Sequence, residues 1–129
     1  MLCRSGEEPF CRSYQILGEH RTGTATELVN VPERNVSKIA DNMPWDVAAA
    51  FPLSTLTAWR MLVTRARVEA GETVLIWGVG GGVSLAALQI ARHLGATVFA
   101  TSSTELKLAK ARELGAAATF NHEIGRAHV

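Results

Sequence analysis

A glycine-rich junction at residues 76–84 most constrains what this chain can fold into. The apolar segment 73–76 runs into it and a segment with helical apolar periodicity follows, so the junction connects a predicted strand to a predicted helix. Glycine lets the backbone turn sharply and approach a ligand closely. The free N–H groups and positive dipole end of the following helix then attract an anion. The junction therefore predicts a site for the pyrophosphate of a dinucleotide.

The glycine spacing departs from the strict G-x-G-x-x-G fingerprint, because Val83 stands where the third glycine would fall. We interpret the motif with one extra residue in the turn. Gly78 then makes the tight turn, and Gly81 and Gly82 let the backbone approach the pyrophosphate. Ser84 is the small residue where the helix meets the strand. We assign all five as cofactor-binding residues, and the alternative is a glycine-rich turn that binds nothing.

From residue 73 onward, apolar strands alternate with helical segments. Strands are predicted at 73–77, 97–100 and 117–120, and helices at 83–94 and from 104 to about 114. This alternation indicates a right-handed, parallel βαβαβ unit. The predicted fold class is therefore α/β, with a partial Rossmann fold.

The segment before residue 73 carries weaker patterns. They predict a short strand at 27–31, an extended segment at 35–39, a short helix at 46–50 capped by Asp46, and a helix from 53 to about 66 with Pro52 in its first turn.

The end of the second predicted strand bears on which dinucleotide is bound. NAD-selective sites usually place Asp or Glu there, to accept a hydrogen bond from the ribose 2′-OH. This chain has hydroxyl side chains instead, and a lysine follows one turn into the helix. That set suits a 2′-phosphate, so we predict NADP(H) in preference to NAD. The predicted contacts are Thr101, Ser102, Ser103 and Lys107. The alternative, which can hold at the same time, is that residues 102–104 cap the helix.

Composition narrows the class of protein. The 13 Lys and Arg residues nearly balance the 12 Asp and Glu residues, which argues against a nucleic acid or a charged membrane surface as partner. A hydrophobic content of 47% is typical of a globular protein. The sequence shows no apolar run of about 20 residues and no signal peptide at its start. We therefore expect a cytoplasmic protein whose partner is a small-molecule substrate.

Several spaced motifs occur in one order: Leu56–Arg60, Gly71–Ile76, the glycine-rich junction and Leu114–Ala116. Together they resemble the medium-chain dehydrogenase/reductase superfamily, with the zinc-containing alcohol dehydrogenase and quinone-reductase-like branches nearest. The resemblance covers about residues 3–123. It implies a GroES-like, mostly β catalytic domain fused to a Rossmann domain, with NAD(P)H-dependent hydride transfer in the cleft between them.

This resemblance implies a division of the chain. Residues 1–51 would be the C-terminal part of the GroES-like domain, 52–123 the first half of the Rossmann domain, and 124–129 an unassigned tail. The chain would then be an interior fragment of an NAD(P)-dependent alcohol dehydrogenase-like or quinone oxidoreductase-like enzyme. We expect it to be inactive alone and a homo-oligomer, dimer or tetramer, at full length. The alternatives are a non-enzymatic dinucleotide sensor and a non-functional remnant.

The resemblance also implies metal sites. Many members carry a structural zinc lobe written C-x2-C-x2-C-x7-C, and Cys3 and Cys11 have the spacing of its last two ligands. The first two ligands would lie upstream, and the alternative is two unrelated thiols. The catalytic zinc's third ligand, a cysteine where present, falls at Leu53, which cannot coordinate a metal. This favours members that reduce quinones or activated double bonds without a catalytic metal.

Other candidate residues can be explained without a functional role. In the resembling enzymes Thr57 would face the nicotinamide ring, and the alternative is a hydroxyl bonded to its own helix backbone. The histidines, His93 and His122 among them, have no partner at metal-ligand spacing, so we assign them no role. Trp77 follows the first strand beside the glycine-rich junction, where its fluorescence would report on binding.

Overall fold

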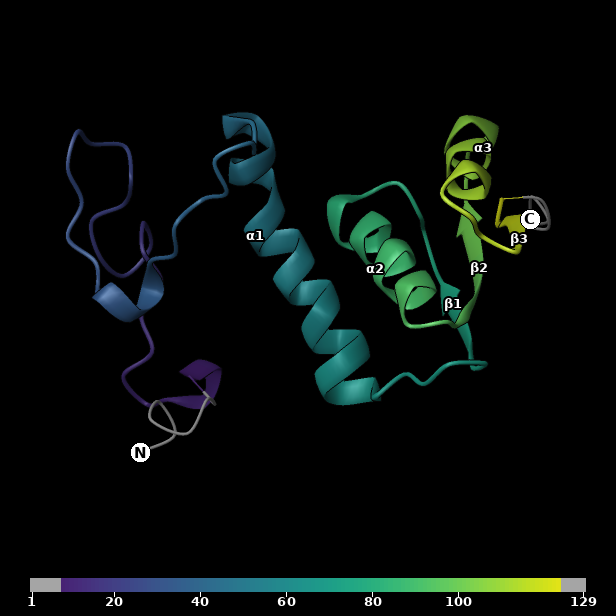
Figure 1. Cartoon of the computed structure of the whole chain (residues 1–129), viewed down its shortest axis with the longest axis horizontal. Coiled ribbons are helices and arrows are strands. Elements are labelled where there is room, and N and C mark those ends of the chain that lie inside the picture. Colours follow the sequence, from purple (N-terminus) through teal and green to yellow (C-terminus); the bar gives the residue numbers. More distant parts are fainter. Residues whose placement is uncertain (1–7, 124–129) are drawn as a thin grey trace, which may run out of the picture. The chain divides into compact units, whose positions relative to one another are not determined.

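The computed structural model describes residues 8–123 of the chain (Figure 1). Its internal contacts form two compact units, Met1–Ile39 and Ala40–Val129. The domain boundary predicted between residues 51 and 52 is not tested by this division and stays a prediction.

The first unit is irregular. Its helical pieces within the described residues are two short 3-10 turns, η2 (Glu8–Phe10) and η3 (Glu33–Asn35). The predicted strand at 27–31 is wrong, since the backbone there is bent or irregular and Leu28 is 88% exposed. An isolated strand without a pairing partner is not stable in water. Val36, in the predicted extended segment, does have extended backbone angles, with φ −116° and ψ 135°.

The second unit begins with one long helix where the sequence predicted two. Helix α1 spans Trp45–Trp59 and continues directly into the π-helix η4 (Arg60–Ala66). Pro44 occupies the N-cap position, so Asp46 lies in the first turn and is not the cap. Pro52 sits inside α1, where a proline costs about 3 kcal/mol because it lacks an N–H and crowds the preceding turn. The helix persists because it packs along α2 (Gly82–His93), and this tertiary contact outweighs the local penalty.

The rest of the second unit is the predicted parallel α/β unit. Strands β1 (Thr73–Ile76), β2 (Thr97–Ser102) and β3 (Ala118–Asn121) pair in parallel in the order β1-β2-β3. Helix α2 connects β1 to β2, and α3 (Glu105–Glu113) connects β2 to β3 (Figure 1). The pairing aligns Ile76 with Ala100 and Ser102 with Asn121. The predicted βαβαβ topology is therefore confirmed, with element ends displaced by one or two residues.

The two faces of the sheet differ in burial. Val98 and Ala100 point toward the helices and are 1% and 0% exposed, and Leu88 of α2 is fully buried in the same cluster. Side chains alternate between faces along a strand, so the residues between them point the other way. On that face Leu75 is 59% and Phe120 is 51% exposed. The core of this unit therefore lies on the helical side of the sheet.

The helix that runs from Trp45 to Ala66 is also long and apolar enough, by length and composition alone, to cross a membrane. The expectation that no segment reaches this length was therefore wrong. This is weak evidence for a membrane span, because core helices of soluble proteins pass the same test. Ala58 and Leu62, which lie on this helix, belong to the same buried cluster as the sheet and α2.

Candidate functional site

The glycine-rich loop lies at the carboxyl end of β1 and leads directly into the N-terminus of α2. Gly78 and Gly80 have positive φ angles, +73° and +134°, which non-glycine residues adopt only with strain. Two residues later α2 begins, and helix geometry leaves the first N–H groups, those of Gly82 and Val83, without intrahelical partners. Such N–H groups, at the positive end of a helix dipole, are suited to bind a phosphate.

Thr101 of β2 ties this loop to the neighbouring strand. Its Oγ1 accepts a hydrogen bond from the Gly78 N–H at 3.0 Å, and its carbonyl oxygen accepts one from the Val79 N–H at 2.7 Å. Thr101 itself is only 5% exposed. The start of the loop is therefore fixed from two points of one buried residue.

Ser84, in the first turn of α2, fixes the other end of the loop. Its Oγ accepts hydrogen bonds from the N–H groups of Gly80 at 3.2 Å and Gly81 at 3.1 Å, and it donates one to the Gly81 carbonyl oxygen at 3.0 Å. A hydroxyl has one donor and two acceptor positions, so all of its capacity is used. Ser84 is thus more than the small packing residue that the motif predicts.

Lys107 of α3 extends along the loop. A Cβ placed on Gly80 would lie 2.7 Å from Cδ of Lys107 and 3.2 Å from its Cγ and Cε. The glycine therefore makes room for the aliphatic part of the Lys107 side chain. The structure thus brings together the glycine-rich loop and Lys107, which the sequence predicted to bind one cofactor.

The hydroxyl residues at the end of β2 are less accessible than the sequence suggested. Thr101 and Ser102 are 5% and 2% exposed, whereas Ser103 is half-buried. Thr104 is the N-cap residue of α3, but its side chain makes no capping hydrogen bond. Of this group, the half-buried Ser103 and the exposed Thr104 and Lys107 are the residues open to a ligand.

Helix α1 also lies close to the end of this loop. A Cβ on Gly82 would lie 3.3 Å from Cβ of Ser54, so α1 and the start of α2 are in close contact. One turn along α1, Thr57 is exposed and its Oγ1 donates a hydrogen bond to the Leu53 carbonyl oxygen at 2.7 Å. This is the alternative given above for Thr57, a hydroxyl bonded to its own helix backbone. The hydroxyl oxygen can still accept a hydrogen bond from a ligand. Leu53 is 81% exposed.

Sequence reasoning missed one member of the site, His122. This residue directly follows β3, and its ring stacks on Trp77 with centroids 5.0 Å apart and planes 14° apart. Its Nδ1 lies 3.1 Å from Oγ1 of Thr101. Its position in the sequence could have identified it. His122 follows the third strand, and the carboxyl ends of parallel strands meet at one edge of the sheet.

Of the two cysteines in the predicted zinc pair, only Cys11 lies within the described residues. Cys3 lies outside the described residues, and Cys11 lies in the first unit and is half-buried. Between residues 8 and 123 no group of three or more His, Cys, Asp or Glu residues could hold a metal ion. The zinc half-site therefore stays a prediction.

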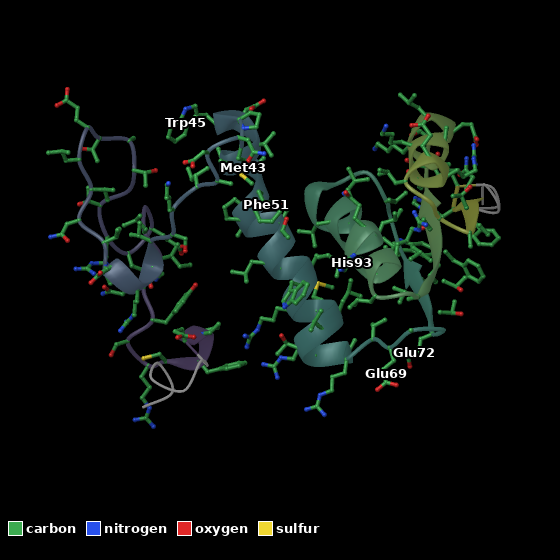
Figure 2. The ribbon with its side chains drawn as sticks, viewed as in Figure 1. Met43, Trp45, Phe51, Glu69, Glu72 and His93 are labelled. Carbon is green, nitrogen blue, oxygen red and sulfur yellow. The ribbon has the colours of Figure 1, made fainter. Side chains whose placement is uncertain are left out.

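Three cavities of the described residues lie away from the glycine-rich loop. One of about 530 Å³ belongs to the first unit and is lined by residues between Gln15 and Asn30. One of about 450 Å³ lies between the C-terminal ends of α2 and α3. The third, about 270 Å³, runs between α1 and α2, and its lining includes Phe51 and His93, which are labelled in Figure 2. None of the predicted cofactor residues lines any of the three.

Comparison with known proteins agrees with this geometry. The zinc-binding dehydrogenase family matches residues 82–128. The chain is 37% identical over 102 residues to a zinc-type alcohol dehydrogenase-like protein of Leptosphaeria maculans, which covers 78% of this chain and 28% of that protein. It also superposes on a crystal structure of an NAD-dependent alcohol dehydrogenase with a TM-score of 0.89 and 48% identity, over 95% of this chain and 36% of that one.

A third similar protein is known with its cofactor. It is the quinone oxidoreductase of Thermus thermophilus, solved alone and as a complex with NADPH, and it superposes with a TM-score of 0.68 and 36% identity. The match covers 74% of this chain and 32% of that one. The chain thus spans between 28% and 36% of the length of these three proteins.

Proposed function

Because the chain belongs to the medium-chain dehydrogenase/reductase superfamily, we propose that it forms the cofactor-binding part of an NADPH-dependent oxidoreductase that reduces a quinone or another activated double bond. The observation that carries this proposal is the glycine-rich loop at the carboxyl edge of a parallel sheet, with Lys107 against it. Dinucleotides bind at that edge of doubly wound sheets.

The residues of the loop fit a dinucleotide. The N–H groups of Gly82 and Val83 are oriented by α2 toward an anion at its N-terminus, which suits the pyrophosphate. The exposed ammonium group of Lys107 and the half-buried hydroxyl of Ser103 are the groups that suit a 2′-phosphate. When bound, the nicotinamide of NADPH supplies a hydride to the substrate. The role of this part of the chain is to bind and orient that cofactor.

The proposed substrate class rests on Leu53. In the resembling enzymes this position holds a cysteine ligand when a third catalytic zinc ligand is present, and a leucine side chain cannot bind a metal. Without a metal to polarise a carbonyl or an alcohol, the acceptors that remain accessible to hydride are already electron-poor, such as quinones and conjugated double bonds. Leu53 is 81% exposed on α1, so its side chain is accessible from outside the protein.

Residues outside the second unit add further proposals. Residues 1–51 would be the end of a GroES-like domain, and Cys3 and Cys11 would be two of four ligands of a structural zinc. A Cys11→Ser variant of the protein made from its complete gene should then lose about one zinc per chain, measured by elemental analysis. We also propose a cytoplasmic homo-oligomer, which sedimentation of the same protein would test.

Steady-state kinetics of the protein made from its complete gene test the proposed reaction. NADPH oxidation would be followed with a quinone acceptor, and NADP reduction with a primary alcohol. We expect turnover with the quinone, and a higher kcat/KM with NADPH than with NADH. Binding of NADPH without turnover of any acceptor would favour a dinucleotide sensor. Turnover with the alcohol alone would contradict the proposed substrate class.

A further inference from the structure

The hydroxyl of Thr101 lies where the ends of all three strands meet. It accepts a hydrogen bond from the Gly78 N–H, which follows β1, at 3.0 Å. It also lies 3.1 Å from Nδ1 of His122, which follows β3. Thr101 itself belongs to β2, and its backbone carbonyl receives the Val79 N–H at 2.7 Å. One side chain therefore joins three separate segments of the chain at the edge that carries the glycine-rich loop.

Burial makes this hydroxyl hard to replace. Thr101 is 5% exposed, so water does not reach its side chain freely. Gly78 itself is exposed, and the hydrogen bond that it donates to Oγ1 of Thr101 is part-buried. Loss of the hydroxyl would therefore remove the acceptor that the protein itself fixes in place at this turn. Gly78 has φ +73°, a conformation that glycine leaves readily, so its position depends on external hydrogen bonds.

We propose that Thr101 is a positioning residue for the cofactor loop: its buried hydroxyl holds the Gly78 turn, and through Gly78 the loop of residues 78–82, in the geometry that receives a pyrophosphate. This inference rests on the proposed dinucleotide function. It differs from the sequence prediction that Thr101 touches the cofactor, because the hydroxyl is in a residue only 5% exposed and already has two partners inside the protein.

Three variants of the protein made from its complete gene test the role. Thr101→Val keeps the shape and removes the hydroxyl, and it should raise the dissociation constant for NADPH about tenfold, measured by the fluorescence of the bound nicotinamide. Thr101→Ser restores the hydroxyl and should recover most of the affinity. Val98→Ala, in the same strand and 1% exposed, destabilises the core without touching the loop and should leave the dissociation constant unchanged.

Turnover separates positioning from catalysis. With a reducible acceptor, Thr101→Val should raise KM for NADPH and leave kcat at saturating NADPH unchanged. Equal affinity in Thr101→Val and the unaltered protein would overturn the proposal, as would equal weakening in the valine and serine variants. Weakening by Val98→Ala to the same extent would also overturn it, because general loss of stability would then explain the effect.

Hydrogen exchange of backbone amides tests the proposal without any cofactor, and it still decides the matter if Thr101→Val does not fold. In the unaltered, cofactor-free protein the Gly78 amide should exchange at least tenfold more slowly, relative to its intrinsic rate, than the amide of the exposed Leu28 in the same sample. Equal protection of the two amides would overturn the proposal. If NADPH fails to bind the unaltered protein, the proposed function fails, and this exchange measurement still shows whether the Gly78 turn is held.

Discussion

The side chain of Lys107 lies against Gly80, so closely that a Cβ on the glycine would fall 2.7 Å from Cδ of the lysine. Gly80 belongs to the loop after β1 and Lys107 to the first turns of α3, so the contact bridges two consecutive βα connections. The absence of a side chain at Gly80 thus has a second use beyond its φ of +134°. It lets a cationic side chain run along a loop that is suited to phosphate.

Replacement of Lys107 by glutamine should change cofactor preference. If the ammonium group contacts the 2′-phosphate, kcat/KM with NADPH should fall about tenfold or more, because a charge-assisted hydrogen bond contributes roughly 1.5–3 kcal/mol. The value with NADH, which has no 2′-phosphate, should change little. The measurement is the ratio of the two kcat/KM values in the protein made from its complete gene.

Lys110→Gln is the matched control for that experiment. Lys110 lies on the same helix, and its Nζ is 2.9 Å from Oε2 of Glu113 in an exposed ion pair. Exposed pairs of this kind contribute little to stability, and this one involves no residue of the glycine-rich loop. An equal loss of NADPH preference in both variants would show that the effect is general surface charge.

Two glycines with nearly the same backbone conformation offer a matched test of the loop. Gly78 and Gly71 have φ angles of +73° and +88°, and neither has any atom within 4 Å of the place where a Cβ would lie. Substitution by alanine should therefore cost each about 1–2 kcal/mol of unfolding free energy, since both conformations are left-handed. Only Gly78→Ala should also weaken NADPH binding, by about tenfold.

Denaturant unfolding and NADPH titration of both variants provide the two measurements. Gly71 precedes β1 and receives no role in cofactor binding, so it reports the backbone penalty alone. If Gly71→Ala weakened NADPH binding as much as Gly78→Ala does, the proposed role of the glycine turn would be wrong.

Ser84 allows a test of how far the loop is preorganised. Its Oγ accepts hydrogen bonds from the N–H groups of Gly80 and Gly81. These groups are exposed, so Ser84→Ala should lower the unfolding free energy by less than about 1 kcal/mol, because water replaces the lost bonds. NADPH affinity should fall several-fold as the loop loses its fixed geometry, and Ser84→Thr should keep it. Tighter binding by the alanine variant would instead mean that the hydroxyl competes with the phosphate for the same N–H groups.

The sequence predicted the second unit well because its patterns are local. Each strand is a short apolar run and each helix has its own apolar periodicity, so the parallel topology followed from their alternation. The single helix through Pro52 could not be predicted this way, since packing against α2 outweighs the proline penalty. The strand expected at 27–31 failed for the opposite reason, because its apolar residues have no partner strand within the described residues.

The parts of the candidate site that lie close together in the sequence could be predicted. The parts that meet only across neighbouring strands could not. The glycine motif and Lys107 were found from spacing alone. The buried hydrogen bonds of Thr101 depend on the register of β2 against its neighbours, which the sequence does not display. His122 was passed over for the same reason, because its neighbour Trp77 is far away in sequence and close only across the sheet edge.

The buried cluster between α2 and the sheet should dominate the stability of the second unit. Leu88 is 0% exposed and lies at its centre, so Leu88→Ala should lower the unfolding free energy by roughly 2–5 kcal/mol through lost burial and the cavity that remains. Leu106→Ala makes the same chemical change on α3, where the side chain is 83% exposed, and should change stability by no more than about 0.5 kcal/mol. Urea unfolding followed by circular dichroism measures both. A similar small effect at the two positions would mean that Leu88 is not packed in a core, and that the arrangement of α2 on the sheet is wrong.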